Sequence, residues 1–200
     1  MSTSHLHNKE EVVSQNFGRS MISVLNSEKI DNWVKKWKRN KTFLHLQFVR
    51  KSDKWKTFFF PSKQKIITSS DLVLLYKGKG RRPHSAFSLF INLLSAIEHV
   101  GGSLYILGGS TELLSVVYQN VQQTFPQLRI IGKFCGKLDH EMEHSVLTAI
   151  RKAEPDLLFL GNKMKNGNKW LQQKRTELPQ CLAVWSQEIF LRISGVYSAR

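Results

Sequence analysis

Residues 103–161 read SLYILGGSTELLSVVYQNVQQTFPQLRIIGKFCGKLDHEMEHSVLTAIRKAEPDLLFLG. Three short apolar runs rich in branched and aromatic residues stand at 103–107, 128–131 and 157–160. They recur about every 26 residues, the length of one strand–helix unit. Between them, apolar residues recur at helical spacing. Strands that are apolar on both faces and alternate with helices predict a parallel sheet covered on both sides.

Residues typical of turns and helix caps stand between the predicted strands and helices of this stretch. Gly108-Gly109 ends the first strand, and Ser110 is expected to cap the following helix, with Glu112 in its first turn. We expect Gly132 to end the second strand and Asp139 to cap the next helix. Open α/β sheets bind ligands where a strand end meets a helix N-terminus. A tight turn also uses glycine, so Gly108 and Gly109 fit both a ligand site and a turn.

The rest of the chain extends the same pattern. We predict one doubly wound α/β domain over residues 18–200, with a mostly parallel, Rossmann-like sheet, preceded by a polar, aperiodic arm over residues 1–17 that is disordered. Two hundred residues suffice for a single domain of this class. The further predicted elements are strands at 20–25, 42–49 and 71–75 and helices at 27–38 and 83–99.

Two basic segments allow more than one interpretation. Trp33 and Trp37 share one face of the first helix among lysines, which fits either a membrane or nucleic-acid surface or a helix that packs both rings on the sheet. We favour packing, because the apolar face is narrow. After the strand at 71–75, residues 76–83 read YKGKGRRP. Glycines and cations at a strand end suit a phosphate, although a solvated basic loop has the same composition.

The overall composition constrains compartment and partners. The chain has thirty Lys and Arg residues and fifteen Asp and Glu residues, which gives a formal net charge of +15. A charge of this size points to an anionic partner, namely nucleic acid, an anionic membrane face or a phosphorylated substrate, or only to a lysine-rich surface. Cys135 and Cys181 are too few for a disulfide framework, and no run is long enough to cross a bilayer. With no signal peptide visible, we expect a cytoplasmic protein.

Residues 140–144 read HEMEH, a literal H-E-x-x-H pattern. This pattern can place two imidazoles one helical turn apart around a zinc ion, with the glutamate as base. Its context argues against zinc. His140 falls in the first turn of the predicted helix, the flanking residues are polar, and no third ligand is marked. We therefore expect no metal site, and the acids suit a helix start.

Several weak motifs in a fixed order resemble one family. They are LGG at 107–109, FPQLRIIGKFCGKLD at 125–139, IRKAEPDLLFLG at 150–161 and KWLQQKRTELP at 169–179. In order and spacing over about residues 71–195, they are similar to the WecG/TagA/CpsF glycosyltransferases. The resemblance implies transfer of N-acetylmannosamine from a UDP-sugar to a polyprenyl-diphosphate-linked sugar, in cell-surface polysaccharide synthesis. It further implies no cofactor, an enzyme that is often oligomeric, and action as a peripheral protein at the inner face of the cytoplasmic membrane.

The resemblance also suggests substrate-binding positions, and it shows departures. Tyr76-Lys77 stands where the family has an Asp-Gly turn with the proposed catalytic base, so we nominate no catalytic residue. Gly167-Asn168 stands where the family has Gln-Glu, and the family's basic C-terminal appendage does not follow. The suggested substrate-binding residues are Arg81, Arg82, Gly108, Gly109, Gly161, Lys163 and Trp170.

Two functional classes therefore stay open. One is a diverged glycosyltransferase. The other is a catalytically silent relative that acts as a basic binding module for nucleotide-sugar, RNA or an anionic membrane, with nucleic acid the less favoured partner. Carboxylates separate the two classes, because transfer to a hydroxyl needs a base whereas binding needs only cations. Asp139, Asp156 and Glu188 are the acids expected near strand ends.

Overall fold

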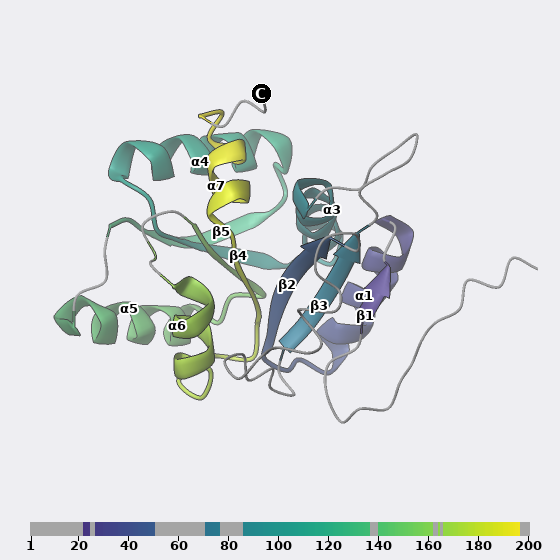
Figure 1. The fold of residues 1–200 in the computed structure, drawn as a ribbon, viewed down its shortest axis with the longest axis horizontal. Coiled ribbons are helices and arrows are strands. Elements are labelled where there is room, and N and C mark those ends of the chain that lie inside the picture. The colour runs from purple at the N-terminus through teal and green to yellow at the C-terminus, as the bar shows by residue number, and fades with distance from the viewer. Residues whose placement is uncertain are drawn as a thin grey trace, which may run out of the picture.

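The computed structural model describes residues 22–24, 27–50, 71–76, 86–136, 140–161, 164 and 166–196. Within these residues seven strands form one sheet in the order β1-β3-β2-β7-β6-β4-β5, and all neighbouring strands pair in parallel (Figure 1). The expected α/β sheet is confirmed. The strands are β1 (Ile22–Val24), β2 (Leu44–Arg50), β3 (Asp71–Tyr76), β4 (Ser103–Leu107), β5 (Arg129–Phe134), β6 (Leu157–Leu160) and β7 (Leu182–Trp185).

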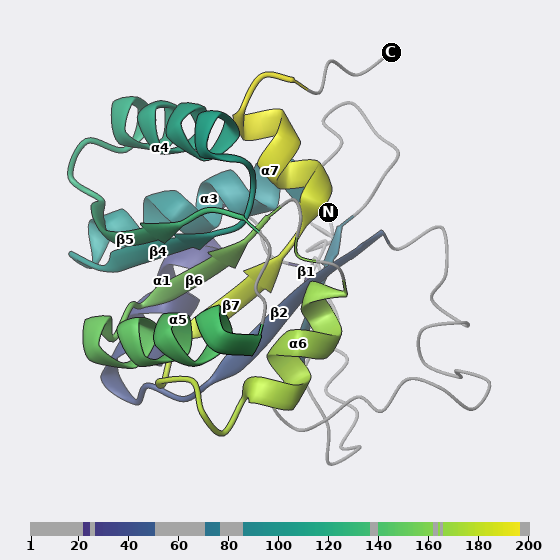
Figure 2. The same cartoon turned by 90° about the vertical axis from the view of Figure 1, so that its left-hand side faces the viewer.

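Helices cover both faces of this sheet, so the fold is doubly wound. The helices are α1 (Ser27–Arg39), α3 (Ala86–His99), α4 (Thr111–Thr124), α5 (His140–Ala153), α6 (Gly167–Lys174) and α7 (Gln187–Ile193). Side chains of α1, α3, α4 and α7 belong to one apolar core, and those of α5 and α6 belong to a second. Figure 2 shows α3, α4 and α7 on one side of the central strands and α5 and α6 on the other.

Successive side chains of the central strands point alternately into the two cores. Leu104 and Ile106 of β4 enter the first core, whereas Tyr105 and Leu107 enter the second. All five residues of β4 and all four of β6 are buried. A strand that is buried on both faces reads as a continuous apolar run, because neither set of alternate side chains meets water. This is why the runs at 103–107 and 157–160 predict both strands to the residue.

The two tryptophans of α1 pack inside the protein. Trp37 is buried in the first core, and its indole N–H donates to the carbonyl oxygen of Thr42 at 3.0 Å. Trp33 is half-buried against the same core. The packing interpretation of α1 is therefore confirmed, because both rings contact the first core.

The prediction that Gly132 ends its strand is wrong. β5 continues through this glycine to Phe134. A Cβ on Gly132 would lie 2.2 Å from Cε2 of Tyr105, so the position is a glycine because the tyrosine ring of β4 crosses it. A glycine inside a strand often marks such a close approach. The pairing with β4 also shifts register between Leu104 and Tyr105, a β-bulge on the edge strand.

Other predicted boundaries agree within a few residues. The helix expected at 83–99 is described from Ala86, the helix at 27–38 runs to Arg39, and the strand at 42–49 runs from Leu44 to Arg50. The predicted arm at 1–17 lies outside the described residues, as do the basic loop after Tyr76 and the expected helix cap at Asp139.

Candidate active site

The carboxyl ends of β4 and β6 are where the chain connections diverge. The two strands are hydrogen-bonded neighbours. β4 is followed by α4 on one face of the sheet, and β6 is followed by α6 on the opposite face. Open α/β sheets bind ligands at such a topological switch point. Gly108, Gly109 and Ser110 after β4 and Gly161 after β6 form this place, which we call the switch point.

Backbone conformation requires the two glycines after β4. Gly108 has φ 115° and Gly109 has φ 82°, both in the region that favours glycine. Gly108 N–H donates to the carbonyl oxygen of Phe134 at 2.9 Å, and Gly136 N–H donates to that of Gly109 at 2.8 Å. Ser110 caps α4 as predicted, because its Oγ accepts the N–H of Leu113 at 3.3 Å. The turn that precedes α4 is thus hydrogen-bonded to the end of β5.

Phe190 of α7 fills the space beneath the switch point. A Cβ on Gly161 would lie 1.8 Å from Cδ2 of this ring, and one on Gly109 would lie 3.0 Å from its Cε1. Phe190 is fully buried and its ring centre lies 5.6 Å from that of Phe159. The absence of side chains at Gly109 and Gly161 therefore leaves room for the Phe190 ring against the backbone. A ligand at the switch point would lie on the outer side of these glycines.

Trp170 joins α6 to α5. Its indole N–H donates to Oε1 of Glu143 at 2.6 Å, and Lys174 Nζ lies 2.9 Å from Oε2 of the same carboxylate. Hydrogen bonds to Glu143 and Glu177 raise the pKa of the Lys174 ammonium. The second glutamate of HEMEH thus has partners on α6. Among the residues with described side chains, which exclude His140, no three His, Cys, Asp or Glu lie together as a metal site would need.

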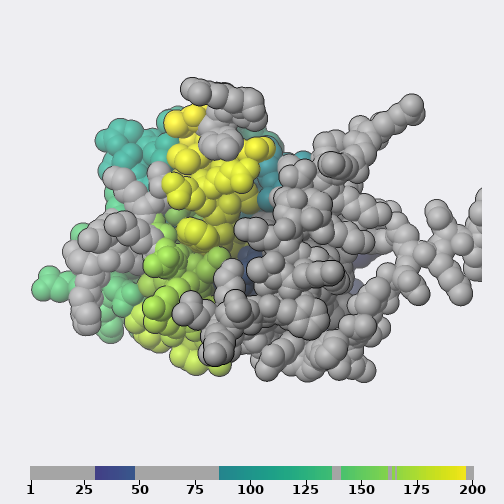
Figure 3. Space-filling view, in the orientation of Figure 1, coloured from purple at the N-terminus to yellow at the C-terminus, as the bar shows by residue number. Residues whose placement is uncertain are grey.

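Gly167 and Asn168, at the start of α6, have partners inside the protein. A Cβ on Gly167 would lie 2.1 Å from Cδ1 of Trp185, so the glycine makes room for this ring. Asn168 Oδ1 lies 2.9 Å from Nε2 of His45, which is buried in β2. Both positions therefore help pack α6 against β7 and β2. Figure 3 shows the surfaces of α6 and α7 meeting in one strip.

The candidate carboxylates lie at opposite ends of the sheet. Asp156 precedes β6 and so lies at the amino ends of the strands, away from the switch point. Glu188 lies in the first turn of α7, at the carboxyl ends, and pairs with Arg192 at 3.1 Å. Asp139 is outside the described residues. The first turn of α4 adds the exposed Glu112, immediately after the switch-point turn. Because Asp156 lies at the opposite end of the sheet from the switch point, it is no longer a candidate for the base. Glu112 becomes a candidate because it lies beside the switch point.

Asp156 holds the N-terminal part of the fold to the central strands. Only 2% of its side chain is exposed; Oδ2 accepts the N–H of Ser103 at 2.9 Å and lies 2.6 Å from Lys38 Nζ, while Lys41 Nζ lies 2.5 Å from Oδ1. Burial alone would raise the pKa of Asp156, but the hydrogen bonds and charges of the two lysines outweigh it and hold the pKa below its usual range. The arrangement is that of a structural ion pair.

Comparison with known proteins adds to this geometry. The chain matches the model of the glycosyl transferase WecG/TagA/CpsF family over residues 27–199. It belongs to the WecG/TagA/CpsF family of glycosyltransferases. The match begins well before residue 71, so it includes α1 and β2 as well as the motifs of the C-terminal half. No curated protein shows significant similarity to the chain.

Membership of the WecG/TagA/CpsF family implies, in general terms, a nucleotide-sugar donor and a lipid-linked acceptor. Within the described residues, no helix is long and apolar enough to span a bilayer. Of the predicted substrate-binding residues, Gly108, Gly109 and Gly161 come together at the switch point, and Trp170 lies on α6 with its N–H on Glu143. Arg81, Arg82 and Lys163 lie outside the described residues.

Two features of this candidate site were not predicted from the sequence. Nothing in the sequence indicates that Phe190 contacts the glycines that follow β4 and β6, because that contact depends on how α7 packs against the sheet. Glu112 is recognisable in the sequence as an acid in the first turn of a helix that follows a strand and a Gly-Gly turn. An acid in a first turn also stabilises the helix start, so this pattern alone does not indicate a chemical role. The position of Glu112 beside the switch point makes it a candidate for chemistry as well.

Proposed function

We propose that the protein transfers an N-acetylhexosamine, similar to N-acetylmannosamine, from a UDP-sugar to a polyprenyl-diphosphate-linked sugar in cell-surface polysaccharide synthesis. The observation that carries this proposal is the meeting of Gly108, Gly109 and Gly161 at the switch point of a family-matched α/β fold. Enzymes of this architecture bind nucleotides there. The N-terminus of α4 follows the glycines directly, and a helix N-terminus favours phosphate.

The reaction assigns separate tasks to the two sides of the sugar. The acceptor hydroxyl attacks the anomeric carbon as its bond to the UDP oxygen breaks, with inversion. A base removes the hydroxyl proton, and cations or helix N–H groups stabilise the negative charge on the leaving diphosphate. In this proposal Glu112 and Glu188 are the candidate bases, since both are exposed at the carboxyl ends of the strands. Arg81, Arg82 and Lys163 stay proposed diphosphate ligands.

Donor binding is tested first by thermal unfolding with UDP and UDP-N-acetylmannosamine. We expect both to raise the melting temperature, because a ligand that binds only the native state stabilises it. Arg82→Ala and Gly109→Ala should weaken the rise. Gly101→Ala is the matched control, since Gly101 also has positive φ, 62°, but lies at the opposite end of β4. No rise at millimolar nucleotide in the unaltered protein would reject the donor site.

One observation favours a second candidate, a catalytically silent relative that still binds nucleotide-sugar. Gly167 and Asn168, which the resemblance places where the family has Gln-Glu, both contribute to packing against Trp185 and His45. The two candidates are separated by turnover. A donor-dependent rise in melting temperature, without transfer to a lipid-linked acceptor and without UDP release, would favour the silent relative.

A further inference from the structure

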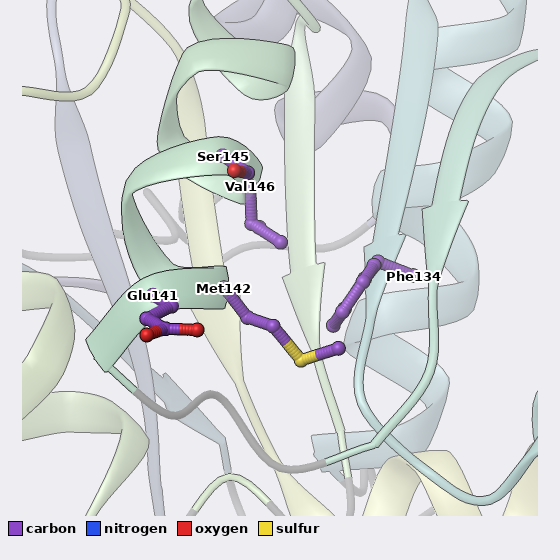
Figure 4. A pocket seen from close by; sticks show the side chains of 5 residues that line it. All are labelled: Phe134, Glu141, Met142, Ser145 and Val146. Atoms are coloured by element: carbon purple, nitrogen blue, oxygen red, sulfur yellow. The ribbon is translucent and has the colours of Figure 1, made fainter.

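An apolar depression opens between the end of β5 and the first two turns of α5. It has a volume of about 350 Å³ and is lined by Phe134, Glu141, Met142, Ser145 and Val146. Figure 4 shows the side chains of Phe134, Met142 and Val146 converging on it from the strand and the helix. The volume falls at the lower end of the range for small-molecule sites.

The depression is unusually exposed for apolar side chains. Met142, which lines it, is 46% exposed. It is one of the four large apolar residues that are exposed in the described part of the chain; the others are Val116, Ile131 and Val196. Exposed apolar surface at a concave site marks a place that binds something apolar.

The depression adjoins the switch point through the backbone. The carbonyl oxygen of Phe134 accepts the N–H of Gly108 at 2.9 Å. Two residues later, Gly136 N–H donates to the carbonyl oxygen of Gly109 at 2.8 Å. The end of β5 therefore contributes both to the depression and to the backbone contacts of the switch point, so a molecule bound in the depression lies next to one bound over Gly108 and Gly109.

The residues that line the depression favour binding of an uncharged hydrocarbon group. None of the five carries a positive charge, and the Glu141 carboxylate would repel a phosphate placed there. Phe134 and Val146 offer apolar surface, and the unbranched thioether of Met142 adapts to irregular shapes. In the proposed function the adjoining switch point, where the N-terminus of α4 favours anions, holds the diphosphate of the donor. The apolar depression beside it therefore suits the hydrocarbon part of the second substrate, which has to reach the donor.

We propose that this depression binds the first isoprene units of the lipid-linked acceptor, next to its diphosphate. This inference rests on the proposed function, which supplies an acceptor of that chemistry. Met142 then acts as a specificity-determining residue for the lipid chain, and the depression orients the acceptor so that its sugar faces the donor at the switch point.

Binding of two probes tests the inference. Farnesyl diphosphate carries three isoprene units, and n-propyl diphosphate carries the same anion without them. Equilibrium binding to the full chain should favour farnesyl diphosphate. Met142→Gln keeps the side-chain length and removes apolar contact, so it should weaken farnesyl diphosphate binding about three- to tenfold and leave the propyl compound unchanged. Val116→Gln is the matched control, an exposed apolar residue on α4 that should change neither.

The outcomes separate this inference from the proposed function. Equal binding of the two probes, or a farnesyl preference that survives Met142→Gln, would overturn the inference even if UDP still raised the melting temperature. A farnesyl preference abolished by Met142→Gln supports it. If that preference appears while UDP and UDP-sugar give no thermal response, the lipid site stands and the proposed donor chemistry is rejected.

Discussion

Lys38 Nζ lies 2.6 Å from Oδ2 of Asp156, and this ion pair joins the last turn of α1 to the residue that precedes β6. The two residues are 118 positions apart in the chain. Lys41 adds a second cation to the same buried carboxylate. The pair therefore ties the N-terminal helix to the central strands, at the end of the sheet opposite the switch point.

Removing the carboxylate should destabilise the protein. Asp156→Asn leaves two lysine ammonium groups beside a neutral amide and weakens the acceptor for the Ser103 N–H. We expect the free energy of unfolding to fall by about 3 kcal/mol, as when one partner of a buried ion pair is removed. Urea unfolding measures this loss. Glu154→Gln, the same change at an exposed carboxylate, should cost under about 0.5 kcal/mol; equal losses would refute a special role for Asp156.

The same ion pair should make stability depend on acid pH. Because the folded pKa of Asp156 lies below its unfolded value of about 3.9, the ionised carboxylate stabilises the fold above that pH. The stabilisation is lost as pH falls through the folded pKa. The difference in unfolding free energy between the unaltered protein and Asp156→Asn should therefore be constant near neutral pH and shrink below about pH 4. A difference that stays constant to pH 2 would contradict this.

Gly161 and Phe190 should be energetically coupled. A methyl group on Gly161 would lie 1.8 Å from the ring, so Gly161→Ala should cost about 1–3 kcal/mol of stability or more. Phe190→Leu alone should also destabilise, by loss of packing. The double variant should be more stable than the sum of the two losses predicts, because the smaller side chain makes room for the methyl group. Denaturant unfolding of all four proteins gives the coupling energy, and simple additivity would show that the ring moves aside.

Replacing the base of the proposed reaction should slow transfer without weakening substrate binding. If Glu112 or Glu188 is that base, its change to glutamine should lower kcat about 10²- to 10⁴-fold with little change in KM for the donor, and the other variant should keep its activity. Steady-state UDP release in the presence of a lipid-linked acceptor measures both constants. Glu154→Gln at the opposite end of the sheet is the control for loss of one negative charge. Full activity in both active-site variants would exclude Glu112 and Glu188 as the base.

The two cysteines should differ sharply in reactivity. Cys181 is fully buried, and burial raises the pKa of its thiol to about 12, whereas Cys135 is partly exposed. The thiolate is the reactive form, so a thiol reagent at pH 8 should modify one cysteine in the native protein and both after unfolding. Cys135→Ala should remove the native-state reaction. Rapid modification of both cysteines without denaturant would show that the segment around Cys181, just before β7, opens readily.

Local sequence patterns predicted most of the fold. Strands β4 and β6 are buried on both faces, so their apolar runs, bounded by polar and glycine residues, marked both ends correctly. The N-cap of α4 was likewise visible, because capping depends on Ser110 and the three residues after it. The edge strand was misjudged at Gly132, where the glycine makes room for Tyr105, a residue 27 positions away that only strand pairing brings near.

The sequence by itself determined the class of fold, the order of its strands and helices as far as β6, and the glycines that meet at the switch point. Those features follow from periodicity and turn chemistry, which act over a few residues. Only the tertiary structure decided the tasks of individual side chains. It placed Asp156 with Lys38 and Lys41, put Phe190 under Gly109 and Gly161, and set Phe134 beside Met142. Each of these contacts joins distant parts of the chain, so it depends on how complete elements pack rather than on any local pattern.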